Sequence, residues 1–395
     1  MKVLLIDVNA KSSSTGKIVH SLYEQVKARG AEAAVCYGRG EVLHEENIFK
    51  FGLDWETYLH ALLTRLTGFT GCFSFFSTRR LLRFINQYQP DVVHIHELHA
   101  YFVNIKPVLS YLKKNNIKTI CTLHCEFMYT GKCGHSGACE NWKTECGNCP
   151  RVHEYPASLL FDQTKYMFRQ KKKLIHGFND MTIVTPSVWL AERAKQSFLS
   201  HCTIMVINNG IDLSVFKPRE SDFRQRHGIS PDKFVILGVS MAWGSSKGLD
   251  VFVELSKRLD ERFKIVLVGT DDKIDQQLTG DIISVHRTEN QQGLAEIYTA
   301  ADLFVNPTRE ENYPTVNMEA IACATPVLTF RTGGSPEIID ETCGSIVECD
   351  DIDSMEQEIL RIFTERPYSE EACLKRAKSF DESLRYEEYL GLYGL

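Results

Sequence analysis

Hydrophobic positions along this chain alternate between two patterns. Short, mainly apolar runs, such as residues 3–8 and 303–305, end at asparagine or proline and predict buried strands. Longer stretches carry apolar residues about four positions apart, as Ile18, Leu22 and Val26 do, and predict helices with one face on a core. Strands and helices that alternate in this way predict an α/β fold with parallel sheets.

The size and charge of the chain narrow the class of protein. Its 395 residues can form two domains with full cores, and a net charge of −6 argues against general nucleic-acid binding. No run of 18 apolar residues is present, so we expect no membrane-spanning helix. Asp7 interrupts the first apolar run too early for a signal peptide, so we expect a cytoplasmic protein whose thirteen cysteines are mostly reduced.

Two carboxylates frame the start of a predicted helix in the second half of the chain. Pro314 suits a first helical position, because that position has no use for an N–H group. Thr315 and Val316 then offer unpaired N–H groups, which suit a phosphate. Glu311 and Glu319 only accept hydrogen bonds, so they suit donors such as sugar hydroxyls. This combination predicts a nucleotide-sugar site; the alternative is that both glutamates merely cap or solvate a helix.

The spacing from Glu311 to Glu319 resembles the E-x7-E motif of family 4 glycosyltransferases, which have the GT-B fold and retain anomeric configuration. The turn that follows matches the family as well, at Gly333, Gly334, Pro336 and Glu337. The resemblance implies that Glu311 contacts hydroxyls of the donor sugar and Glu319 the ribose of the nucleotide. It places the residues at the helix start in the donor site: Asn312, Tyr313, Pro314, Thr315 and Val316.

Two further positions resemble the donor-phosphate groups of that family. Lys247 matches the lysine that neutralises the donor diphosphate, and Gly16 lies in the loop that faces the donor phosphates and the acceptor. The arginine that usually accompanies this lysine is absent, because Ala242 stands in its place. Either another cation, Arg287 or Arg331, takes over its charge, or stabilisation of the leaving group is weaker.

Histidines mark the expected acceptor side. His124 ends a predicted strand, where ligands bind in α/β folds, and matches the family histidine that touches the donor sugar. The family's following aspartate is replaced by Cys125. The alternative for His124 is a buried histidine with a structural partner. His96 and His99 are candidates for acceptor binding. We expect Glu311, His124 and Lys247 to be the catalytic groups.

The resemblance covers essentially the whole chain and implies two Rossmann-like domains that face each other across a cleft. We expect an acceptor domain over residues 1–210, a donor domain over 211–379, and a terminal helix over 380–395 that packs back on the first domain. The implied reaction transfers a hexose, with retention, from a UDP- or GDP-sugar to a glycan or polyprenyl-linked acceptor of bacterial surface polysaccharide, and needs no catalytic metal. Alternatives are a sugar-nucleotide epimerase or hydrolase and a non-catalytic sugar-binding module.

A cysteine-rich insertion over residues 126–156 resembles the exopolysaccharide subgroup of the family, including colanic-acid-type transferases. Cys146 and Cys149 have the spacing of a metal knuckle, whereas Cys133 and Cys139 are more widely spaced than usual. The favoured interpretation is a structural zinc ion held by all four thiolates. Two disulfides and four free thiols are the open alternatives.

Aromatic and basic residues in the first half predict peripheral contact with the inner face of the cell membrane. Anionic headgroups attract basic side chains, and exposed aromatic rings can enter the interface. The alternative is a solvated basic helix beside core aromatics. The residues concerned are Phe69, Phe73, Phe75, Phe76, Arg79, Arg80, Arg83, Lys165, Arg169, Lys171, Lys172 and Lys173.

Overall fold

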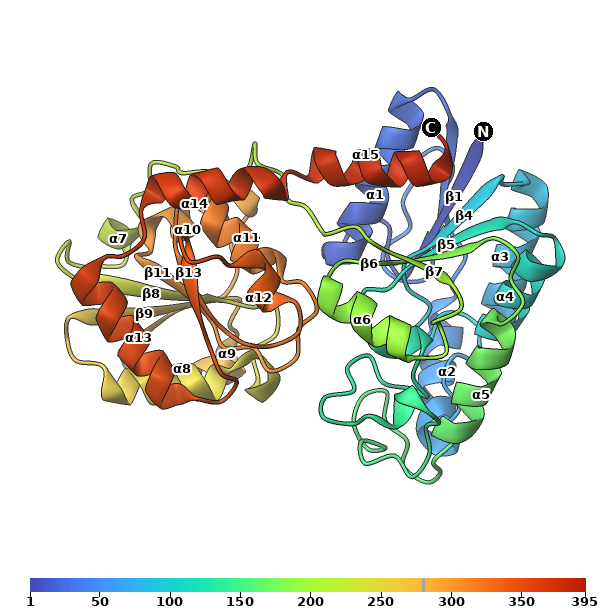
Figure 1. Cartoon of the computed structure of the whole chain (residues 1–395), viewed down its shortest axis with the longest axis horizontal. Coiled ribbons are helices and arrows are strands. Elements are labelled where there is room, and N and C mark those ends of the chain that lie inside the picture. The colour runs from blue at the N-terminus through green and yellow to red at the C-terminus, as the bar shows by residue number, and fades with distance from the viewer. Residues whose placement is uncertain (279–280) are drawn as a thin grey trace. The chain divides into compact units, whose positions relative to one another are not determined.

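The computed structural model describes residues 1–278 and 281–395 and divides the chain into two compact units (Figure 1). Unit 1 comprises Met1–Ile207 together with Tyr386–Leu395, and unit 2 comprises Asn208–Arg385. Each unit has its own parallel sheet and its own hydrophobic core on both faces of that sheet. No helix in the described ranges combines the length and the apolar composition needed to cross a membrane.

Unit 1 contains a seven-stranded parallel sheet in the order β3-β2-β1-β4-β5-β6-β7. The strands in its centre are buried on both faces, which explains their continuous apolar runs. The strands are β1 (Lys2–Asp7), β2 (Glu32–Tyr37), β3 (Ile48–Lys50), β4 (Val92–Ile95), β5 (Lys118–Thr122), β6 (Met181–Thr185) and β7 (Thr203–Val206). The helices are α1 (Ser13–Ala28), α2 (Asp54–Thr67), α3 (Phe75–Tyr88), α4 (Ile105–Lys114), α5 (Thr164–Ile175) and α6 (Val188–Gln196).

The last helix, α15 (Glu382–Tyr393), completes unit 1 from the far end of the sequence. Its buried face packs beside α1 and β1 (Figure 1), where Tyr386 and Leu390 join the core around Val3 and Leu22. The Tyr393 hydroxyl also lies 2.6 Å from His94 Nδ1. A contact between residues 299 positions apart therefore fixes a histidine of β4.

Unit 2 contains a six-stranded parallel sheet in the order β10-β9-β8-β11-β12-β13. The strands are β8 (Phe234–Val239), β9 (Phe263–Val268), β10 (Ile282–Val285), β11 (Leu303–Asn306), β12 (Val327–Phe330) and β13 (Gly344–Val347). The helices are α7 (Phe223–Arg226), α8 (Leu249–Arg258), α9 (Asp272–Asp275), α10 (Gln291–Ala300), α11 (Thr315–Ala322), α12 (Ser335–Ile338), α13 (Ile352–Glu365) and α14 (Glu370–Ala377). The two parallel sheets confirm the predicted α/β class.

Three local features of the structure are not indicated by the pattern of hydrophobic positions. The helix α5 begins only at Thr164, because the Asp162 carboxylate accepts hydrogen bonds from the N–H groups of Cys149 and Thr164 and so holds a loop before the helix. The sequence pattern did not indicate β3, which is a three-residue edge strand. It also did not indicate α14, because this helix contains few apolar residues and buries only two residues.

Each sheet has a point at its centre where the order of the strands reverses. In unit 1 the chain runs outwards from β1 to one edge, then returns to β4 beside β1 and continues to the other edge. In unit 2 the corresponding neighbours are β8 and β11. Ligands of α/β proteins bind beyond the carboxyl ends of the strands at such switch points. The loops after these strands are therefore the places to examine.

Candidate functional site

At the switch point of unit 2 an ion pair joins the two central loops. Lys247 ends a short 3-10 helix, Ser245–Lys247, that follows β8, and Glu311 lies in the loop after β11. Lys247 Nζ is 2.8 Å from Glu311 Oε2, and the two side chains are 37% and 20% exposed. Glu311 Oε1 also accepts the N–H group of Asn312 at 3.1 Å. The structure thus brings two predicted site residues into contact across 64 positions.

The loop that carries Glu311 rests on the glycine turn after β12. Gly333 has a φ of +55°, and a Cβ there would lie 1.9 Å from the carbonyl oxygen of Glu311. The next N–H group, of Gly334, donates to the Asn312 carbonyl at 2.8 Å. A side chain at position 333 would displace the Glu311 backbone, which gives the two-glycine turn a physical reason.

The residues at the start of α11 lie next to this pair in the sequence. Pro314 is the N-cap, and Thr315 and Val316 are the first, half-buried residues of the helix. Asn312 and Tyr313 are buried before it, and burial raises the pKa of Tyr313 to about 12.

Glu319 lies on α11, and its Oε2 accepts the Tyr298 hydroxyl at 3.1 Å. Burial, with the Glu319 charge as a smaller cause, raises the pKa of Tyr298 well above its ordinary value. A hydrogen bond from a buried neutral phenol therefore orients the Glu319 carboxylate.

The two arginines expected to replace the missing cation have different surroundings. Arg331 forms an ion pair with Glu348 at 2.6 Å on an exposed surface. Arg287 is an exposed side chain in the loop after β10. A third arginine, Arg309, binds Asp250 through two hydrogen bonds of 2.8 Å each and also contacts the Ser245 carbonyl, so it ties the Lys247 loop to the β11 loop. Sequence reasoning missed Arg309.

The switch point of unit 1 gathers buried titratable groups instead of an exposed pair. Asp7 ends β1 and is fully buried; its Oδ2 accepts the Thr15 hydroxyl at 3.1 Å. Burial, together with the nearby Glu97 charge, raises the pKa of Asp7 to about 7. Gly16 lies beside this group in the first turn of α1, where a Cβ would come 3.2 Å from Asn9 Cβ.

The predicted histidines stand at the ends of β4 and β5. His96 Nδ1 lies 3.1 Å from His124 Nε2, and the two rings are stacked. Burial lowers the pKa of both imidazoles, which favours their neutral forms. Within the described chain, Asp7 Oδ1, His96 Nε2 and His99 Nδ1 are buried and have no hydrogen-bond partner. Orphaned polar atoms of this kind at one switch point suit a polar ligand.

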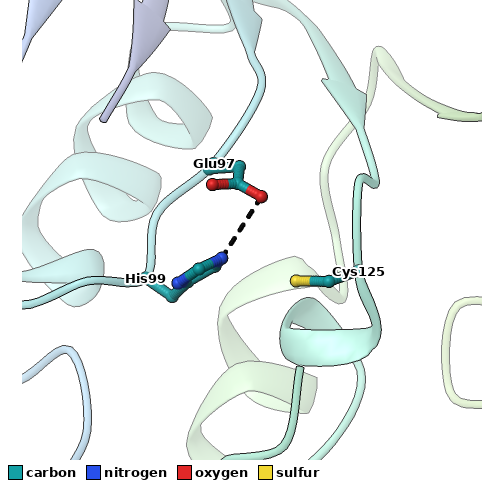
Figure 2. A group of neighbouring side chains, drawn as sticks. All are labelled: Glu97, His99 and Cys125. Atoms are coloured by element: carbon teal, nitrogen blue, oxygen red, sulfur yellow. Dashed lines mark ion pairs between the residues drawn. The ribbon is translucent and has the colours of Figure 1, made fainter. Parts of the chain in front are cut away.

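His99 belongs to a second group with Glu97 and Cys125 (Figure 2). His99 Nε2 is 3.2 Å from Glu97 Oε1, and one ligand-type atom of each residue lies within 4.8 Å of the others. Burial opposes charge on the imidazole, but Cys125 and Glu97 together raise the pKa of His99 well above its ordinary value. Sequence reasoning did not select Asp7, Glu97 or Cys125 as site residues. Two features of the sequence could have pointed to them: Asp7 is a carboxylate at the end of an apolar strand, and Cys125 departs from the family pattern.

The cysteine insertion and the basic segment correct two interpretations. All thirteen cysteines are free thiols, so the alternative of two disulfides is wrong. Lys171 is 1% exposed and hydrogen-bonds to the Phe127 and Thr130 carbonyls, so it is not part of a basic surface. It faces inwards because α5 packs against the insertion. Of the four phenylalanines, Phe75 and Phe76 are exposed, and Phe69 and Phe73 are half-buried.

Comparison with known proteins identifies the family to which this chain belongs. The sequence profile described as Glycosyltransferase Family 4 matches residues 15–215, and the one described as Glycosyl transferases group 1 matches residues 233–365. The putative colanic acid biosynthesis glycosyl transferase WcaC of Escherichia coli K12 is 24% identical over 69% of this chain and 66% of its own length. A GDP-mannose-dependent phosphatidylinositol monomannoside mannosyltransferase of Corynebacterium glutamicum is 26% identical over 45% of this chain. The chain spans just under two thirds of the first relative and 51% of the second.

Solved structures agree on the fold. Sucrose-phosphate synthase from Thermosynechococcus elongatus superposes with a TM-score of 0.73 and 16% identity, covering 99% of this chain and 98% of that one. Anabaena HepE in complex with UDP-glucose gives a TM-score of 0.68 at 16% identity over the whole of both chains. These matches confirm the predicted pair of Rossmann-like units, and the WcaC match agrees with the predicted likeness to the exopolysaccharide subgroup. Because the family 4 profile covers just over half of the residues, this chain belongs to glycosyltransferase family 4.

Proposed function

We propose that this protein transfers a hexose from a UDP- or GDP-sugar, with retention of configuration, to a glycan or polyprenyl-linked acceptor in bacterial surface-polysaccharide synthesis. The observation that carries the proposal is the Lys247–Glu311 ion pair at the switch point of unit 2. The Lys247 cation suits the diphosphate end of a nucleotide sugar, and the Glu311 carboxylate suits the hydroxyls at its sugar end. Anabaena HepE has been solved in complex with UDP-glucose and with UDP, which supports a donor of this class.

When the donor binds, Lys247 and Glu311 would exchange their mutual ion pair for contacts with the donor. In the structure Lys247 and Glu311 satisfy each other, and because both are partly exposed, separating them costs little. The sugar hydroxyls then donate to Glu311, and the diphosphate lies against Lys247. As the glycosidic bond breaks, negative charge grows on the diphosphate, and Lys247 with the N–H groups of Thr315 and Val316 stabilises it. We assign this role to side-chain and backbone groups, so the proposal requires no catalytic metal.

We assign acceptor binding to the switch point of unit 1. A sugar hydroxyl both donates and accepts hydrogen bonds, and the orphaned atoms of Asp7, His96 and His99 offer both kinds of partner. His124 touches His96 and would orient it. The neutral imidazole of His96 and a carboxyl whose pKa is about 7 bind a neutral hydroxyl without the cost of burying further charge.

A polyprenyl-linked acceptor lies in a membrane, and unit 1 has an apolar face that suits it. Exposed apolar residues recur along the outer side of α2 and continue onto α3 and the loop before α5. Ring contacts such as Trp55 with Phe76 join the parts of this apolar face. Its members are Trp55, Tyr58, Leu59, Leu62, Leu66, Phe75, Phe76, Leu159, Leu160, Phe161 and Tyr166. Exposed cations on neighbouring segments are Arg65, Arg79, Arg83, Lys165 and Arg169.

Flotation with anionic vesicles tests the membrane contact. The wild-type chain should float with vesicles at low salt, and the F75S/F76S variant should not, because each substitution removes an exposed ring from the interface. Leu384→Ser is the control, since Leu384 is also exposed but lies on α15. Equal flotation of all three proteins, or none for the wild type, would refute this contact.

A thermal-shift panel tests the donor assignment. UDP- and GDP-sugars would be added singly to the full chain, and donors of one base should raise Tm, because a ligand at a hundred times its Kd stabilises by about 2.7 kcal/mol. The shift should disappear in Lys247→Ala. If every nucleotide sugar leaves Tm unchanged, the donor site is wrong.

Product analysis separates transfer from the other activities of similar folds. With the effective donor and a polysaccharide or lipid extract as acceptor, the expected product is a new glycoside. Free sugar without glycoside would favour a hydrolase, a changed sugar on the nucleotide an epimerase, and binding without turnover a sugar-binding module.

A further inference from the structure

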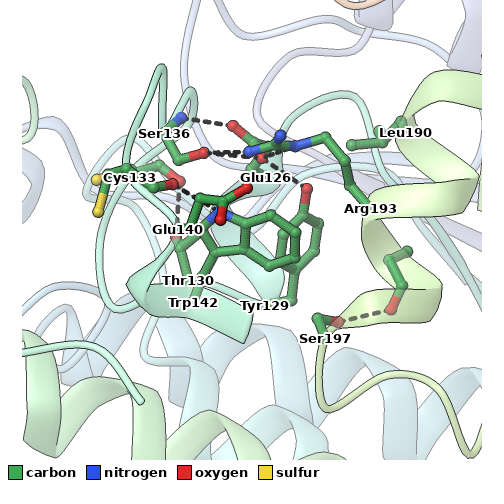
Figure 3. Close-up of polar contacts among 12 residues, drawn as sticks. Glu126, Tyr129, Thr130, Cys133, Ser136, Glu140, Trp142, Leu190, Arg193 and Ser197 are labelled. Atoms are coloured by element: carbon green, nitrogen blue, oxygen red, sulfur yellow. Dashed lines mark hydrogen bonds and ion pairs between the residues drawn. The ribbon is translucent and has the colours of Figure 1, made fainter. Parts of the chain in front are cut away.

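The insertion between β5 and α5 has little regular structure, yet it is firmly packed. It contains two short 3-10 helices, Glu126–Met128 and Asn141–Lys143. The Glu126 carboxylate is 2% exposed and binds Arg193 at 2.7 Å, Tyr129 at 2.8 Å and Ser136 (Figure 3). Trp142 is buried beside this network and stacks on Arg193. One side of the insertion is therefore fixed to the core of unit 1 by buried polar bonds.

The other side contains all four cysteines of the insertion around one small cavity. Cys133, Cys139, Cys146 and Cys149 line it, together with Lys132 and Trp142. Cys133 and Cys149 share a thiol hydrogen bond, and Cys146 Sγ accepts the N–H group of Gly131 at 3.2 Å. Backbone N–H groups that donate to sulfur are the second-sphere contacts that stabilise thiolate ligands. Four soft donors meet in one place within a loop that has few apolar residues of its own.

Two buried lysine side chains lie near the cysteines of the cavity. Lys132 Nζ contacts three backbone carbonyls, of Val152, Glu154 and Pro156, at 2.6–3.0 Å. Lys171 Nζ contacts two carbonyls and lies 3.4 Å from the centre of the Phe127 ring. Both side chains are at most 2% exposed, and neither forms an ion pair with a carboxylate within residues 1–278 and 281–395. A buried cation is costly without a counter-charge, so an anionic group in the cavity would stabilise both side chains in their charged forms.

We propose that Cys133, Cys139, Cys146 and Cys149 bind one structural zinc ion as thiolates. Binding releases four protons from the four thiols, and the resulting zinc tetrathiolate carries a net charge of −2, which matches Lys132 and Lys171. Four thiolates complete the tetrahedron and leave no open position, so the ion orders the insertion and takes no part in chemistry. This assignment is independent of the proposed transfer reaction.

The sulfur atoms must close on the ion. They are not among the groups of three ligand atoms within 4.8 Å of one another that the described residues contain. Zinc–sulfur bonds of about 2.3 Å place neighbouring sulfurs about 3.8 Å apart. Rotation of the side chains into the cavity that they already line provides this approach, and the glycines at 131, 134, 137 and 147 leave the backbone free to follow.

Metal analysis of the full chain, purified without added metal and without a metal-affinity column, tests the site. We expect about one zinc ion per chain. A mercurial reagent that modifies thiols should release that zinc in the folded protein. Cys146→Ser should lower the zinc content severalfold, whereas Cys349→Ser should keep it, because Cys349 is an exposed thiol of unit 2.

A second measurement keeps the test independent of whether Cys146→Ser folds. Wild-type protein from cells grown in cobalt should show the charge-transfer absorption of a thiolate-bound, tetrahedral ion. Protein without zinc or cobalt, in which all four thiols of the folded chain react with Ellman's reagent, would overturn the proposal. Zinc retained equally by both serine variants would overturn it as well.

Discussion

The two switch points share one topology but differ in how deeply their charged groups lie. In unit 2 the side chains of Lys247 and Glu311 are 37% and 20% exposed and pair directly. In unit 1 Asp7 and His96 are 0% and 3% exposed, and each has a polar atom without a hydrogen-bond partner among the residues that the structure describes. The same reversal of strand order is therefore accompanied by an exchangeable ion pair in unit 2 and by a set of buried titratable groups in unit 1.

This difference indicates whether each site responds mainly to the donor or mainly to pH. A partly exposed ion pair can be exchanged for the charges of a ligand at small cost, so the unit 2 site should respond mainly to donor. Burial shifts the pKa of Asp7 to about 7, so the unit 1 site should respond mainly to pH. Three substitutions, given in decreasing order of their predicted effect, test this contrast.

Removing the Glu311 carboxylate should have the largest effect on activity. Hydrogen bonds to a charged group contribute about 1.5–3 kcal/mol each, so Glu311→Ala should lower kcat/KM on the order of a hundredfold or more, with Tm nearly unchanged. Glu310→Ala is the matched control in the same loop and should keep most of the activity. If the two variants transfer sugar equally well, Glu311 does not contact the donor.

Replacing Asp7 should make stability less dependent on pH. Because its folded pKa of about 7 exceeds the unfolded value near 3.8, the folded state binds more protons between these values, and wild-type stability falls as pH rises through this window. Asp7→Asn removes this loss, so its free energy of unfolding relative to wild type should rise by about 2 kcal/mol from pH 5 to pH 7.

Urea unfolding at several pH values measures this change. Asp54→Asn, an exposed carboxylate of the same unit, is the control and should show a difference from wild type that does not vary with pH. A pH-independent difference for Asp7→Asn would show that Asp7 is not a buried acid of raised pKa.

The smallest effect should come from the hydroxyl that orients Glu319. Tyr298→Phe removes the 3.1 Å hydrogen bond and should weaken donor binding about fivefold, or about 1 kcal/mol, with kcat nearly unchanged. Tyr368→Phe removes another tyrosine hydroxyl of unit 2, which contacts Arg361, and should leave donor affinity as it is. Calorimetric titration with the effective donor distinguishes them; equal affinities would remove Glu319 from the proposed nucleotide site.

Features that depend on residues close together along the chain could be predicted from the sequence. Short apolar runs fixed the central strands, and Pro314 marked the start of α11 within one residue. The spacing of Glu311, Glu319 and the glycines at 333 and 334 was readable because one strand, turn and helix contain them all. Residues that are close in sequence are also close in space, so the motif, the helix and strands that contain it, and the family could all be predicted from the spacing.

Which charged groups are buried, and which distant residues come into contact, became known only from the three-dimensional fold. Lys171 belongs to a basic segment in the sequence but lies inside unit 1, and α2 turns an apolar stripe outwards. Asp7, Glu97 and Cys125 come from three different strand ends, and His94 finds its partner at Tyr393. Packing of parallel strands brings such residues together, and burial then sets their ionisation. Neither distance nor burial is encoded in the spacing of residues along the chain, so the character of the unit 1 site followed from the fold alone.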